Sequence, residues 1–514
     1  MNAASTERTP RIIIKSLGLA LAIVLLGAGL RFYAIGRKSL WLDEAVTVNL
    51  MGSRYTDMLA GVIGHDAHPP LYYALAHLWT QRSASALRAR AFSAVFGVAT
   101  VAVFYLLARV LLPREGALVA TLLLAVSAFQ VYFAQEARHY ALAAFFVTLS
   151  WYFFVQLVAG RKLENWRWWL GLSLANAAAL YTFYFTLFAV VAQLIVLVLL
   201  WRGIGKRLVV GWLSWQLLPA VLFALYVPVI LEHIASLQGL APPKGLTMLS
   251  GHGLMLTASQ FACGFLPETW GSGEVLLRAA TAALGILTLA AGFVGLRGCR
   301  CATAVTVTWL LGPIACLALL PIRGHAYEPK HLIAAAPAFA LLPAIALVSS
   351  RGLVRGLAAA LVAVLIATNG VSLWRYYDGR VEKENWRGAV AEVIKRVEPG
   401  DIVVFNPFYV RHPFHYYYQG HYREYPIMGV EAPASGEAFR SGELKLGRRI
   451  WLIEGSSRVA VPNPAVVKEL SPHRLLFGPE RFEGLVGSIT VSLYDTFKPP
   501  PKGEAPAGPK GGAH

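Results

Sequence analysis

Charged residues are scarce in this sequence: they make up 14% of its 514 residues, whereas 56% are hydrophobic. Soluble domains usually contain about 25% charged residues. The deficit is uneven, because apolar runs fill residues 14–373 and charged residues become frequent only after them. This distribution excludes a fully soluble protein. It predicts one large membrane domain followed by a smaller soluble domain.

Cysteine is rare, and several nucleotide-binding motifs are missing. The four cysteines, Cys263, Cys299, Cys301 and Cys316, lie in the apolar part, so the soluble region is not a disulfide scaffold. Cys299 and Cys301 are too close together for a zinc site without further ligands. No D-x-D motif occurs, and no P-loop or G-x-G-x-x-G motif follows a predicted strand. The usual site for a nucleotide sugar and its metal therefore has no candidate.

Acidic residues are outnumbered by basic ones, which gives a net charge of +18. In a soluble protein this excess would favour nucleic-acid binding. Here much of it lies in short loops between apolar runs, where basic residues orient a membrane protein. We therefore predict membrane lipids, and no nucleic acid, among the partners.

Eleven apolar runs approach the length of about 20 residues that crosses a membrane. They lie near residues 14–33, 90–112, 117–134, 139–159, 166–183, 185–201, 208–230, 274–296, 302–320, 331–349 and 353–373. The first run follows Arg8, Arg11 and Lys15 and has no small-residue cleavage site after it. We therefore predict an uncleaved first helix rather than a signal peptide.

A shorter run over residues 69–82 begins with two prolines, and loop charges indicate how it is placed. If it does not cross and the N-terminus is cytoplasmic, all the short basic loops lie inside. These loops are near residues 109–114, 161–167, 202–207, 297–300 and 351–355. We therefore predict a re-entrant or interfacial helix over 69–82. The odd number of spans then places the C-terminal domain outside the cytoplasmic (inner) membrane.

The predicted fold is a polytopic α-helical membrane domain with a small C-terminal α/β domain. The membrane domain covers residues 1–375, the soluble domain 376–497, and a disordered tail 498–514, which is rich in Pro, Gly and Ala. Residues 384–398 have helical spacing that Pro399 and Gly400 end. Strands are predicted at residues 401–405, 449–453 and 488–494.

Acidic residues concentrate in the first outer loop, residues 34–70. Its ionisable residues include Asp43, Glu44, Asp57, His65, Asp66 and His68. The loop is too long and amphipathic for a simple connector, and short surface helices are predicted at 46–53 and 57–64. Acidic groups at membrane depth are costly and are therefore functional candidates. The alternatives are that Asp43 and Glu44 face water or cap a helix, and that the histidines belong to an ordinary loop or bind a metal.

Two further polar clusters, residues 135–140 and 323–331, fall on the same predicted side. Each is either a polar turn or part of a site. A carboxylate there could act as a general base, and arginine offers a two-pronged fork to phosphate oxygens. An anionic ligand would also explain the cations predicted outside. These are Arg31, Arg37, Lys38, Arg54, Arg82, Arg88, Arg90, Arg138, Arg323 and Lys330.

Several motifs, in this order, resemble the GT-C membrane glycosyltransferases, in particular the branch of protein O-mannosyltransferases and aminoarabinose transferases with bacterial Rgt-type members. They are WLDEAVTVNL (41–50), HDAHPPLYYALAHLW (65–79), LRARAFSAVFGVATVAVFYLLARVL (87–111), AQEARHYAL (134–142), TFYFTLFAVVAQ (182–193) and WRGAVAEVIKRVEPGDIVVFNPFY (386–409). The likeness is continuous over about residues 1–200 and patchy after that. Each motif alone is weak, and the ordered set is specific.

The resemblance implies an inverting enzyme whose donor is a sugar on a polyprenyl or dolichyl phosphate, with no cofactor and no metal required. Asp43 would deprotonate the acceptor hydroxyl, with Glu44 beside it. Arg90, or its neighbour Arg88, would lie near the lipid phosphate. The donor cavity would be lined by Glu136, Arg138 and Tyr140, and the substrate loop would include Asp66 and His68.

One position departs from the family pattern. Many members open a late transmembrane helix with an Arg-Tyr pair near the lipid phosphate, whereas this chain has Lys330 and His331. Lysine keeps the positive charge but lacks the guanidinium fork. We still expect both residues in the donor site.

Two other function classes fit parts of the sequence. A transporter would carry ionisable residues near mid-membrane and inverted repeats. A non-catalytic receptor or assembly protein would bind a glycan through its soluble domain, for instance at the aromatic-rich residues 413–422. For an enzyme, the candidate acceptors are a protein, a glycolipid and a polysaccharide.

Overall fold

The computed structural model describes residues 3–65, 68–80, 85–159, 162–201, 205–236, 251–265, 273–294, 300–319, 327–379, 382–418, 420, 423–425, 448–457 and 462–496. Its contacts divide the chain into two units. The first comprises Met1–Gly36, Leu50–Leu237 and Leu246–Arg380, and the second Arg37–Asn49, Gln238–Gly245 and Val381–His514. Residues 37–49 of the first outer loop are therefore grouped with the C-terminal part of the chain.

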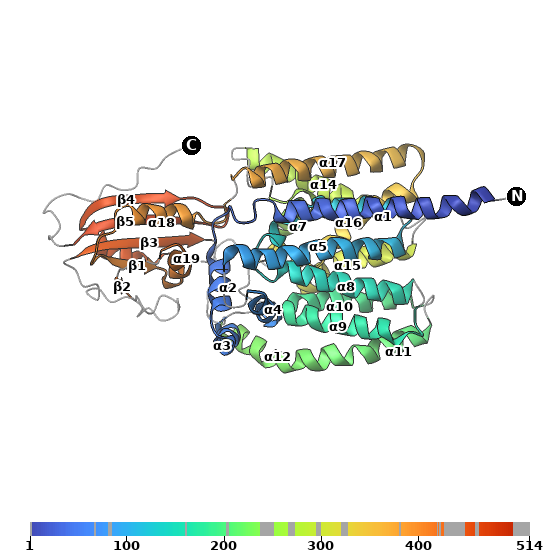
Figure 1. Ribbon diagram of the computed structural model, residues 1–514, viewed down its shortest axis with the longest axis horizontal. Coiled ribbons are helices and arrows are strands. Elements are labelled where there is room, and N and C mark those ends of the chain that lie inside the picture. The colour runs from blue at the N-terminus through green and yellow to red at the C-terminus, as the bar shows by residue number, and fades with distance from the viewer. Residues whose placement is uncertain are drawn as a thin grey trace. The chain divides into compact units, whose positions relative to one another are not determined.

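The first unit is a bundle of helices (Figure 1). They are α1 (Ala3–Phe32), α3 (Tyr55–His65), α4 (Leu71–Thr80), α5 (Ala86–Leu111), α6 (Arg114–Val126), α7 (Ala128–Ala134), α8 (Tyr140–Val158), α9 (Trp166–Thr182), η1 (Tyr184–Thr186), α10 (Leu187–Leu199), α11 (Lys206–Trp215), α12 (Leu217–Ser236), α13 (Gly251–Cys263), α14 (Glu274–Val294), α15 (Arg300–Leu319), η5 (Pro329–Leu332), α16 (Ala336–Ser349) and α17 (Gly352–Tyr377). The long helices α1, α5, α8 and α9 pack side by side, while α3 and α4 cross the end of the bundle.

Every apolar run predicted from the sequence is helical in the described residues, which confirms the mostly helical fold. Five described helices are long and apolar enough to cross a membrane, or six if the bent pair α6–α7 forms one span. The number of crossings therefore stays a prediction. The short run at 69–82 contains α4, and the two predicted surface helices correspond to α2 (Leu42–Gly52) and α3. Helix α13 was not predicted.

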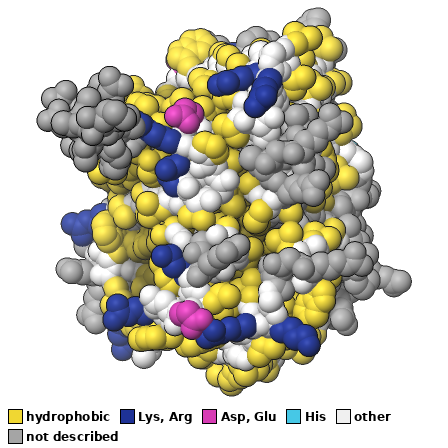
Figure 2. Space-filling model, turned by 90° about the vertical axis from the view of Figure 1, so that its right-hand side faces the viewer, with side chains coloured by type: hydrophobic (Ala, Val, Ile, Leu, Met, Phe, Trp, Pro, Cys, Tyr) yellow, Lys and Arg dark blue, Asp and Glu magenta, His cyan; other side chains and the backbone are white. Residues whose placement is uncertain are grey.

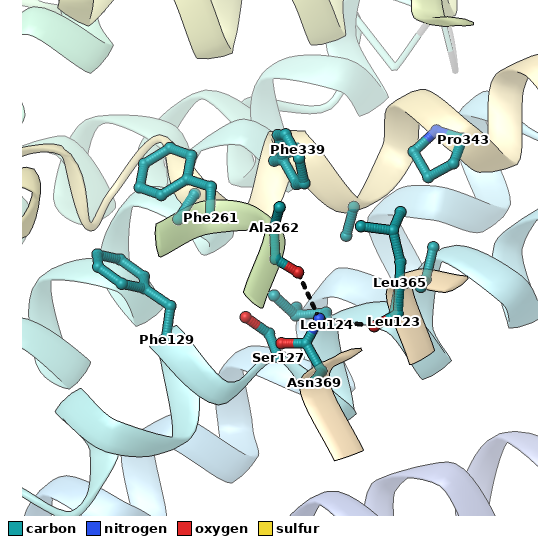
Figure 3. Close-up of a pocket in the computed structure, with 12 residues that line it drawn as sticks. Leu123, Leu124, Ser127, Phe129, Phe261, Ala262, Phe339, Pro343, Leu365 and Asn369 are labelled. Atoms are coloured by element: carbon teal, nitrogen blue, oxygen red, sulfur yellow. Dashed lines mark hydrogen bonds between the residues drawn. The ribbon is translucent and has the colours of Figure 1, made fainter. Parts of the chain in front are cut away.

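The α6–α7 pair bends by 54° at Ser127, and distant side chains bond the backbone groups at this break. Asn369 of α17 accepts the N–H of Ala128 through Oδ1 at 2.8 Å. Its Nδ2 donates to the carbonyl oxygens of Ala262 at 2.6 Å and of Leu365 at 2.8 Å, as Figure 3 shows. A buried amide thus joins α7, α13 and α17, as expected where irregular backbone has no water to bond it.

Arg31 bonds the other side of the same break. Its Nη1 donates to the carbonyl oxygens of Gly27 at 3.1 Å and Ala125 at 3.0 Å, and its Nη2 to that of Leu124 at 3.4 Å. The side chain is 1% exposed. Gly97 of α5 leaves room for it, because a Cβ there would lie 3.1 Å from Arg31 Cδ. Arg31 therefore acts as a C-cap for α6, whose last carbonyls have no partner within their own helix.

A second buried polar network links α8, α9, α10 and the junction of α11 with α12. Asn176 of α9 donates through Nδ2 to Gln193 Oε1 at 3.3 Å and to Gln216 Oε1 at 2.8 Å. Gln193 Nε2 donates to Ser150 Oγ at 2.7 Å, and that hydroxyl bonds Asn176 Oδ1. Trp212 Nε1 donates to Gln193 Oε1 at 3.3 Å. In a membrane the hydrophobic effect does not drive one helix against another, because lipid tails are equally apolar. Hydrogen bonds of this kind therefore help to hold the helices together.

One end of the bundle is basic. Figure 2 shows this end, where Lys and Arg side chains are scattered among hydrophobic ones and few acidic groups are visible. The helix ends that meet there carry basic residues at the end of α5 and the starts of α6, α9, α11 and α17. These residues are Arg109, Arg114, Arg167, Lys206, Arg207 and Arg355. The pattern agrees with the sequence rule that placed these loops in the cytoplasm.

The second unit is built on a five-stranded sheet of order β2-β1-β3-β5-β4. Its strands are β1 (Ile402–Asn406), β2 (Arg423–Tyr425), β3 (Arg449–Ser457), β4 (Arg474–Phe482) and β5 (Gly487–Asp495). Its other elements are α18 (Trp386–Ile394), η6 (Phe408–Val410), α19 (Arg411–Tyr417), α20 (Pro464–Leu470) and residues 42–49 of α2. Strand β1 pairs in parallel with β2 and β3, whereas β5 is antiparallel to β3 and β4.

Successive side chains of a strand point to opposite faces of the sheet, and here both faces are apolar. Trp451 and Ile453 of β3 pack with the helices α18 and α19. Ile450 and Leu452 pack against α20 on the other face. The strands predicted at 401–405, 449–453 and 488–494 are confirmed as β1, β3 and β5. Strand β4 and the helices α19 and α20 were missed, since each is short or exposed on one face.

Candidate active site

Histidine rings and cations from three separate stretches meet at one end of the first unit. The His68 ring lies 4.1 Å from that of His139, between their centroids. Arg138, Lys330 and His331 also act electrostatically on His139, which is fully buried. The stretches before α4, before α8 and before α16 therefore come together. The second and third polar clusters predicted from the sequence lie in one place, together with His68.

Arg138 is held by the short helix α4 and by α5. Its Nη1 donates to Tyr73 Oη at 2.9 Å, and its carbonyl oxygen accepts from Ser93 Oγ at 3.3 Å. Ser93 Oγ in turn lies 3.1 Å from Tyr72 Oη. The Arg138 side chain is 4% exposed. The helix predicted as re-entrant thus supplies two tyrosines that fix the backbone and the guanidinium of a predicted donor-site residue.

The other residues predicted for the donor site differ in their accessibility. Glu136 and Tyr140 are both 2% exposed, and the Tyr140 ring lies 4.3 Å from that of His139. Arg90 is 3% exposed, and its Nη1 donates to the carbonyl oxygen of Ile35 at 3.1 Å. Arg88 is exposed, because two positions along a helix point to nearly opposite faces. The geometry therefore favours Arg90 over Arg88 as the inward-facing cation.

Lys330 and His331 lie in η5, the turn before α16. Lys330 Nζ pairs with Glu328 at 3.0 Å, and the backbone N–H of Glu328 donates to His331 Nδ1 at 3.3 Å. The His331 ring stacks on Phe185 at 4.9 Å. Nearby, burial raises the pKa of Tyr327 to about 12, and its hydroxyl bonds Thr257. A neutral tyrosine and a lysine with 21% of its side chain exposed therefore stand beside the cluster.

Two of the cations predicted to meet an anionic ligand have protein partners instead. Arg31 caps α6 inside the bundle, so its place near the outer loop is structural. Arg54 pairs with Asp57 at 2.9 Å on the exposed first turn of α3. Backbone carbonyls for Arg31 and a carboxylate one turn away for Arg54 therefore account for these charges without an anionic ligand.

The acidic pair Asp43 and Glu44 opens α2 in the second unit. The carbonyl of Trp41 accepts the first helical hydrogen bond, from Ala45 at 3.0 Å, so the pair occupies the first turn. Asp43 is partly exposed and Glu44 is 2% exposed. Carboxylates are stabilised at a helix N-terminus by its unpaired N–H groups and dipole. From the sequence, helix capping is an alternative to a chemical role. The position of the pair in the first turn of α2 is compatible with both.

Some predicted residues fall outside the part of the chain that the structure describes. They are Asp66, the side chain of His65, Arg82, Arg323 and His325. Within the described residues, no group of three or more His, Cys, Asp or Glu side chains could hold a metal ion. The pocket drawn in Figure 3 is lined by none of the predicted site residues and lies beside the α6–α7 break.

His412, which no sequence motif indicated, approaches the far end of α2. Its Nδ1 lies 3.4 Å from Asn49 Nδ2, and burial, followed by the charges of Arg411 and His415, lowers its pKa to about 4. The folded state therefore binds the His412 proton more weakly than the unfolded state does. Below pH 6.5 the unfolded chain takes up this proton first, so stability is lost as pH falls from about 6.5 to 4.

We expect His412→Gln to reduce this acid sensitivity. Thermal unfolding of the full chain in detergent, followed at pH 7.5 and 5.0, should show a smaller loss of Tm for the variant than for the wild type. The buried carboxyls Glu384 and Glu454 have raised pKa values and act in the opposite direction, but they are common to both proteins. Equal losses of Tm would contradict this role for His412.

Comparison with known proteins addresses the fold. ArnT from Cupriavidus metallidurans, solved with undecaprenyl phosphate bound, superposes over 93% of this chain and 97% of its own, with a TM-score of 0.52 and 12% identity. The apo oligosaccharyltransferase of Archaeoglobus fulgidus superposes over 86% of this chain and 69% of its own, with a TM-score of 0.54 and 12% identity. This chain has the GT-C fold. A search of curated proteins gave no match.

A match to one sequence family agrees with the GT-C fold. Residues 67–231 of this GT-C chain match the family described as Dolichyl-phosphate-mannose-protein mannosyltransferase. The matched segment includes His68, α4, Arg90, Arg138 and the start of α8. The resemblance predicted from the motifs is therefore confirmed for the GT-C fold and, over residues 67–231, for the mannosyltransferase family.

Proposed function

We propose that the chain is an inverting glycosyltransferase that moves a sugar from a polyprenyl-phosphate donor to an acceptor hydroxyl on the outer face of the cytoplasmic membrane. The gathering of Arg138, Lys330 and His331 around His139 carries this proposal. Arg138 lies in the segment that matches the mannosyltransferase family, and Lys330 and His331 lie in η5. They suit a phosphate better than a neutral solute.

Phosphate binding is the role we propose for the cations of the first unit. Arg138 and Arg90 offer guanidinium groups, which match phosphate oxygens with two parallel hydrogen bonds. Lys330 adds a compact charge on a flexible stem, and its partly exposed position leaves it room to reach a ligand. Glu136, Tyr140, His68 and His331 would shape the cavity for the sugar.

Asp43 is proposed as the general base. It would remove the proton of the acceptor hydroxyl, whose oxygen attacks the anomeric carbon of the sugar. The bond between that carbon and the phosphate oxygen breaks, and polyprenyl phosphate leaves with the electron pair. Glu44 would support Asp43 or bind the acceptor. The leaving group is already a phosphate ester, so its charge can be met by the cations of the first unit.

The basic bundle end supports the membrane placement that we propose. We propose that this end faces the cytoplasm, together with the N-terminus, and that the second unit lies outside. A prenyl chain would gain about 0.8 kcal/mol for each buried CH₂ group, which supplies binding without a specific polar contact.

Label transfer tests the activity. Purified chain in nanodiscs is incubated with radiolabelled polyprenyl-phosphate sugars and a membrane extract of the source cell, and transfer from lipid to acceptor is measured. We expect transfer from a lipid-linked sugar and none from the matching nucleotide sugar. Transfer from neither donor, together with tight binding of a glycan to the chain, would favour a receptor instead.

The phosphate role of Lys330 has a separate test. We expect Lys330→Gln to raise KM for the lipid donor by about 10- to 100-fold, the range that follows from losing one charged hydrogen bond. Lys330→Arg should keep KM within about threefold, because it keeps the charge. Arg54→Gln, which removes an exposed cation already paired with Asp57, is the control and should leave KM unchanged. An unchanged KM in Lys330→Gln would remove this residue from the phosphate site.

A further inference from the structure

The start of α2 is held within the second unit by a segment 342 to 350 residues further along the chain. We call residues 382–387 the clasp. Glu382 Oε2 accepts the N–H of Ser39 at 3.0 Å, and Glu384 Oε2 accepts the N–H of Leu42 at 3.0 Å. Arg387 donates through its N–H to Ser39 Oγ at 3.1 Å and through Nη1 to the carbonyl oxygen of Arg37 at 2.8 Å. Each residue from 37 to 42 therefore either forms one of these hydrogen bonds or adjoins a residue that does.

Glu384 has the position of a helix cap supplied from elsewhere in the sequence. Leu42 is the first residue of α2, and its N–H is one of the groups that no intrahelical acceptor can reach. The residue before it, Trp41, has no side-chain oxygen that could cap the helix. Glu384 accepts the Leu42 N–H instead, while Asn385 next to it caps α18 through Gly388 at 3.0 Å. Two adjacent residues of the clasp thus cap two different helices.

The Glu384 carboxyl is itself firmly held. It is 8% exposed and also accepts the indole N–H of Trp386 at 2.7 Å, from a side chain in the core of the sheet domain. The clasp backbone is bonded to the β4–β5 turn, since Leu485 and Val486 donate to the carbonyl oxygens of Glu382 and Lys383 at 2.8 and 3.0 Å. A side chain at Gly484 would collide with this backbone, because its Cβ would lie 2.2 Å from the Lys383 oxygen.

We infer that Glu384 is a positioning residue for the transfer reaction: it fixes the first turn of α2, and with it Asp43, onto the sheet of the second unit. This inference rests on the proposed role of Asp43. The path runs from the β4–β5 turn to the clasp backbone, from Glu384 to the N–H of Leu42, and along the chain to Asp43. Glu384 touches no reacting atom in this account.

The charge of Glu384 is consistent with a cap of this kind. Burial raises its pKa, while the N–H groups of Trp386 and Leu42 favour the ionised form and the nearby charge of Asp43 disfavours it. A carboxyl group can accept a hydrogen bond whether or not it is protonated. The side-chain oxygen of glutamine, which does not titrate, also accepts one. Glu384→Gln should therefore keep the cap, whereas Glu384→Ala removes it.

Two readouts on the full-length protein test the inference. The first is hydrogen exchange of peptides covering residues 38–46, and the second is kcat for transfer from the lipid-linked sugar. For Glu384→Ala we expect exchange at the start of α2 to rise by about 2- to 30-fold, as for the loss of a helix cap. We expect kcat to fall by about 10- to 100-fold, as when a reacting group shifts by about an ångström, with KM for the donor unchanged.

The conservative and control variants separate the possible outcomes. Glu384→Gln should restore both values to within about threefold of the wild type, because its oxygen still accepts the bonds. The control Glu392→Ala removes a half-buried carboxylate of α18 that pairs with Arg396, away from the Leu42 N–H, and it should change neither value. Unchanged exchange in Glu384→Ala would overturn the cap, and raised exchange with unchanged kcat would overturn the positioning role. Equal losses of kcat in the Ala and Gln variants would show that the carboxylate itself is needed, which also overturns it.

The proposed function can fail independently. If Asp43→Asn kept full activity, the base assignment would be wrong, and the exchange experiment would still decide whether Glu384 caps α2. If Glu384→Ala did not fold, Glu384→Gln and Gly484→Ala would replace it. Gly484→Ala displaces the clasp backbone without touching Glu384, so it should raise exchange at residues 38–46 and lower kcat. Wild-type values in Gly484→Ala would overturn the path through the clasp.

Discussion

Asp43→Asn is expected to lower kcat for sugar transfer by about 10²- to 10⁴-fold, the usual contribution of a positioned general base. Asparagine has the shape of aspartate and can stay in the first turn of α2, so the helix should form normally. It cannot accept the proton of the acceptor hydroxyl. KM for the lipid donor should change little, because the proposed phosphate site lies among cations of the first unit. Initial rates with a labelled lipid-linked sugar measure both constants.

The control for this variant is Asp57→Asn. Asp57 also lies in the first turn of an outer-loop helix, but it is exposed and pairs with Arg54, so full activity is expected. We also expect EDTA to leave the wild-type rate unchanged, since the proposed mechanism assigns charge stabilisation to cationic side chains. Full activity of Asp43→Asn would direct attention to Glu44 and Glu136 as alternative bases.

Arg31→Leu is expected to destabilise the first unit by about 2–4 kcal/mol. The loss arises because the carbonyl groups at the end of α6 would keep no charged donor, and an unsatisfied buried acceptor costs about 1–3 kcal/mol. Unfolding of the protein by SDS titration in mixed micelles measures the change. Arg31→Lys should lose less, since an ammonium can still reach one carbonyl.

Arg355→Leu is a matched control for Arg31, because Arg355 is exposed near the start of α17. This variant should unfold like the wild type. If Arg31→Leu kept wild-type stability but lost donor binding, the original expectation that Arg31 meets an anionic ligand would be restored.

The helices of the first unit could be predicted well, because apolar runs and loop charges are local properties of the sequence. Helix α13 was missed because its polar residues, such as Gln260 and Ser259, interrupt the apolar pattern. Both face into the protein: Ser259 bonds Thr281 of α14 at 2.7 Å, and Gln260 is 6% exposed. Polar side chains paired between helices look like loop residues when one segment is considered alone.

Candidate site residues could be named from the sequence where a motif carries several of them together. The stretches around Asp43 and around Arg138 had such motifs, and in the structure Arg138, Lys330 and His331 act electrostatically on His139. The partners of these residues could not be predicted. Glu384 lies 342 positions from Leu42, and a glutamate before a helix has many possible roles. Only the fold shows which backbone N–H it accepts.

The network around Asn176 has a consequence for how the chain enters the membrane. Among the described helices, α9 is not one of those long and apolar enough to cross on their own. The side-chain amide of Asn176 would have no hydrogen-bond partner if α9 entered lipid alone. In the fold it donates to Gln193 and Gln216. Helix α9 should therefore be retained at the insertion machinery until α10 and α11 emerge. Helices α9, α10 and α11 would then enter the membrane together. In a nascent chain that stops before residue 216, we expect α9 to be extractable by alkali.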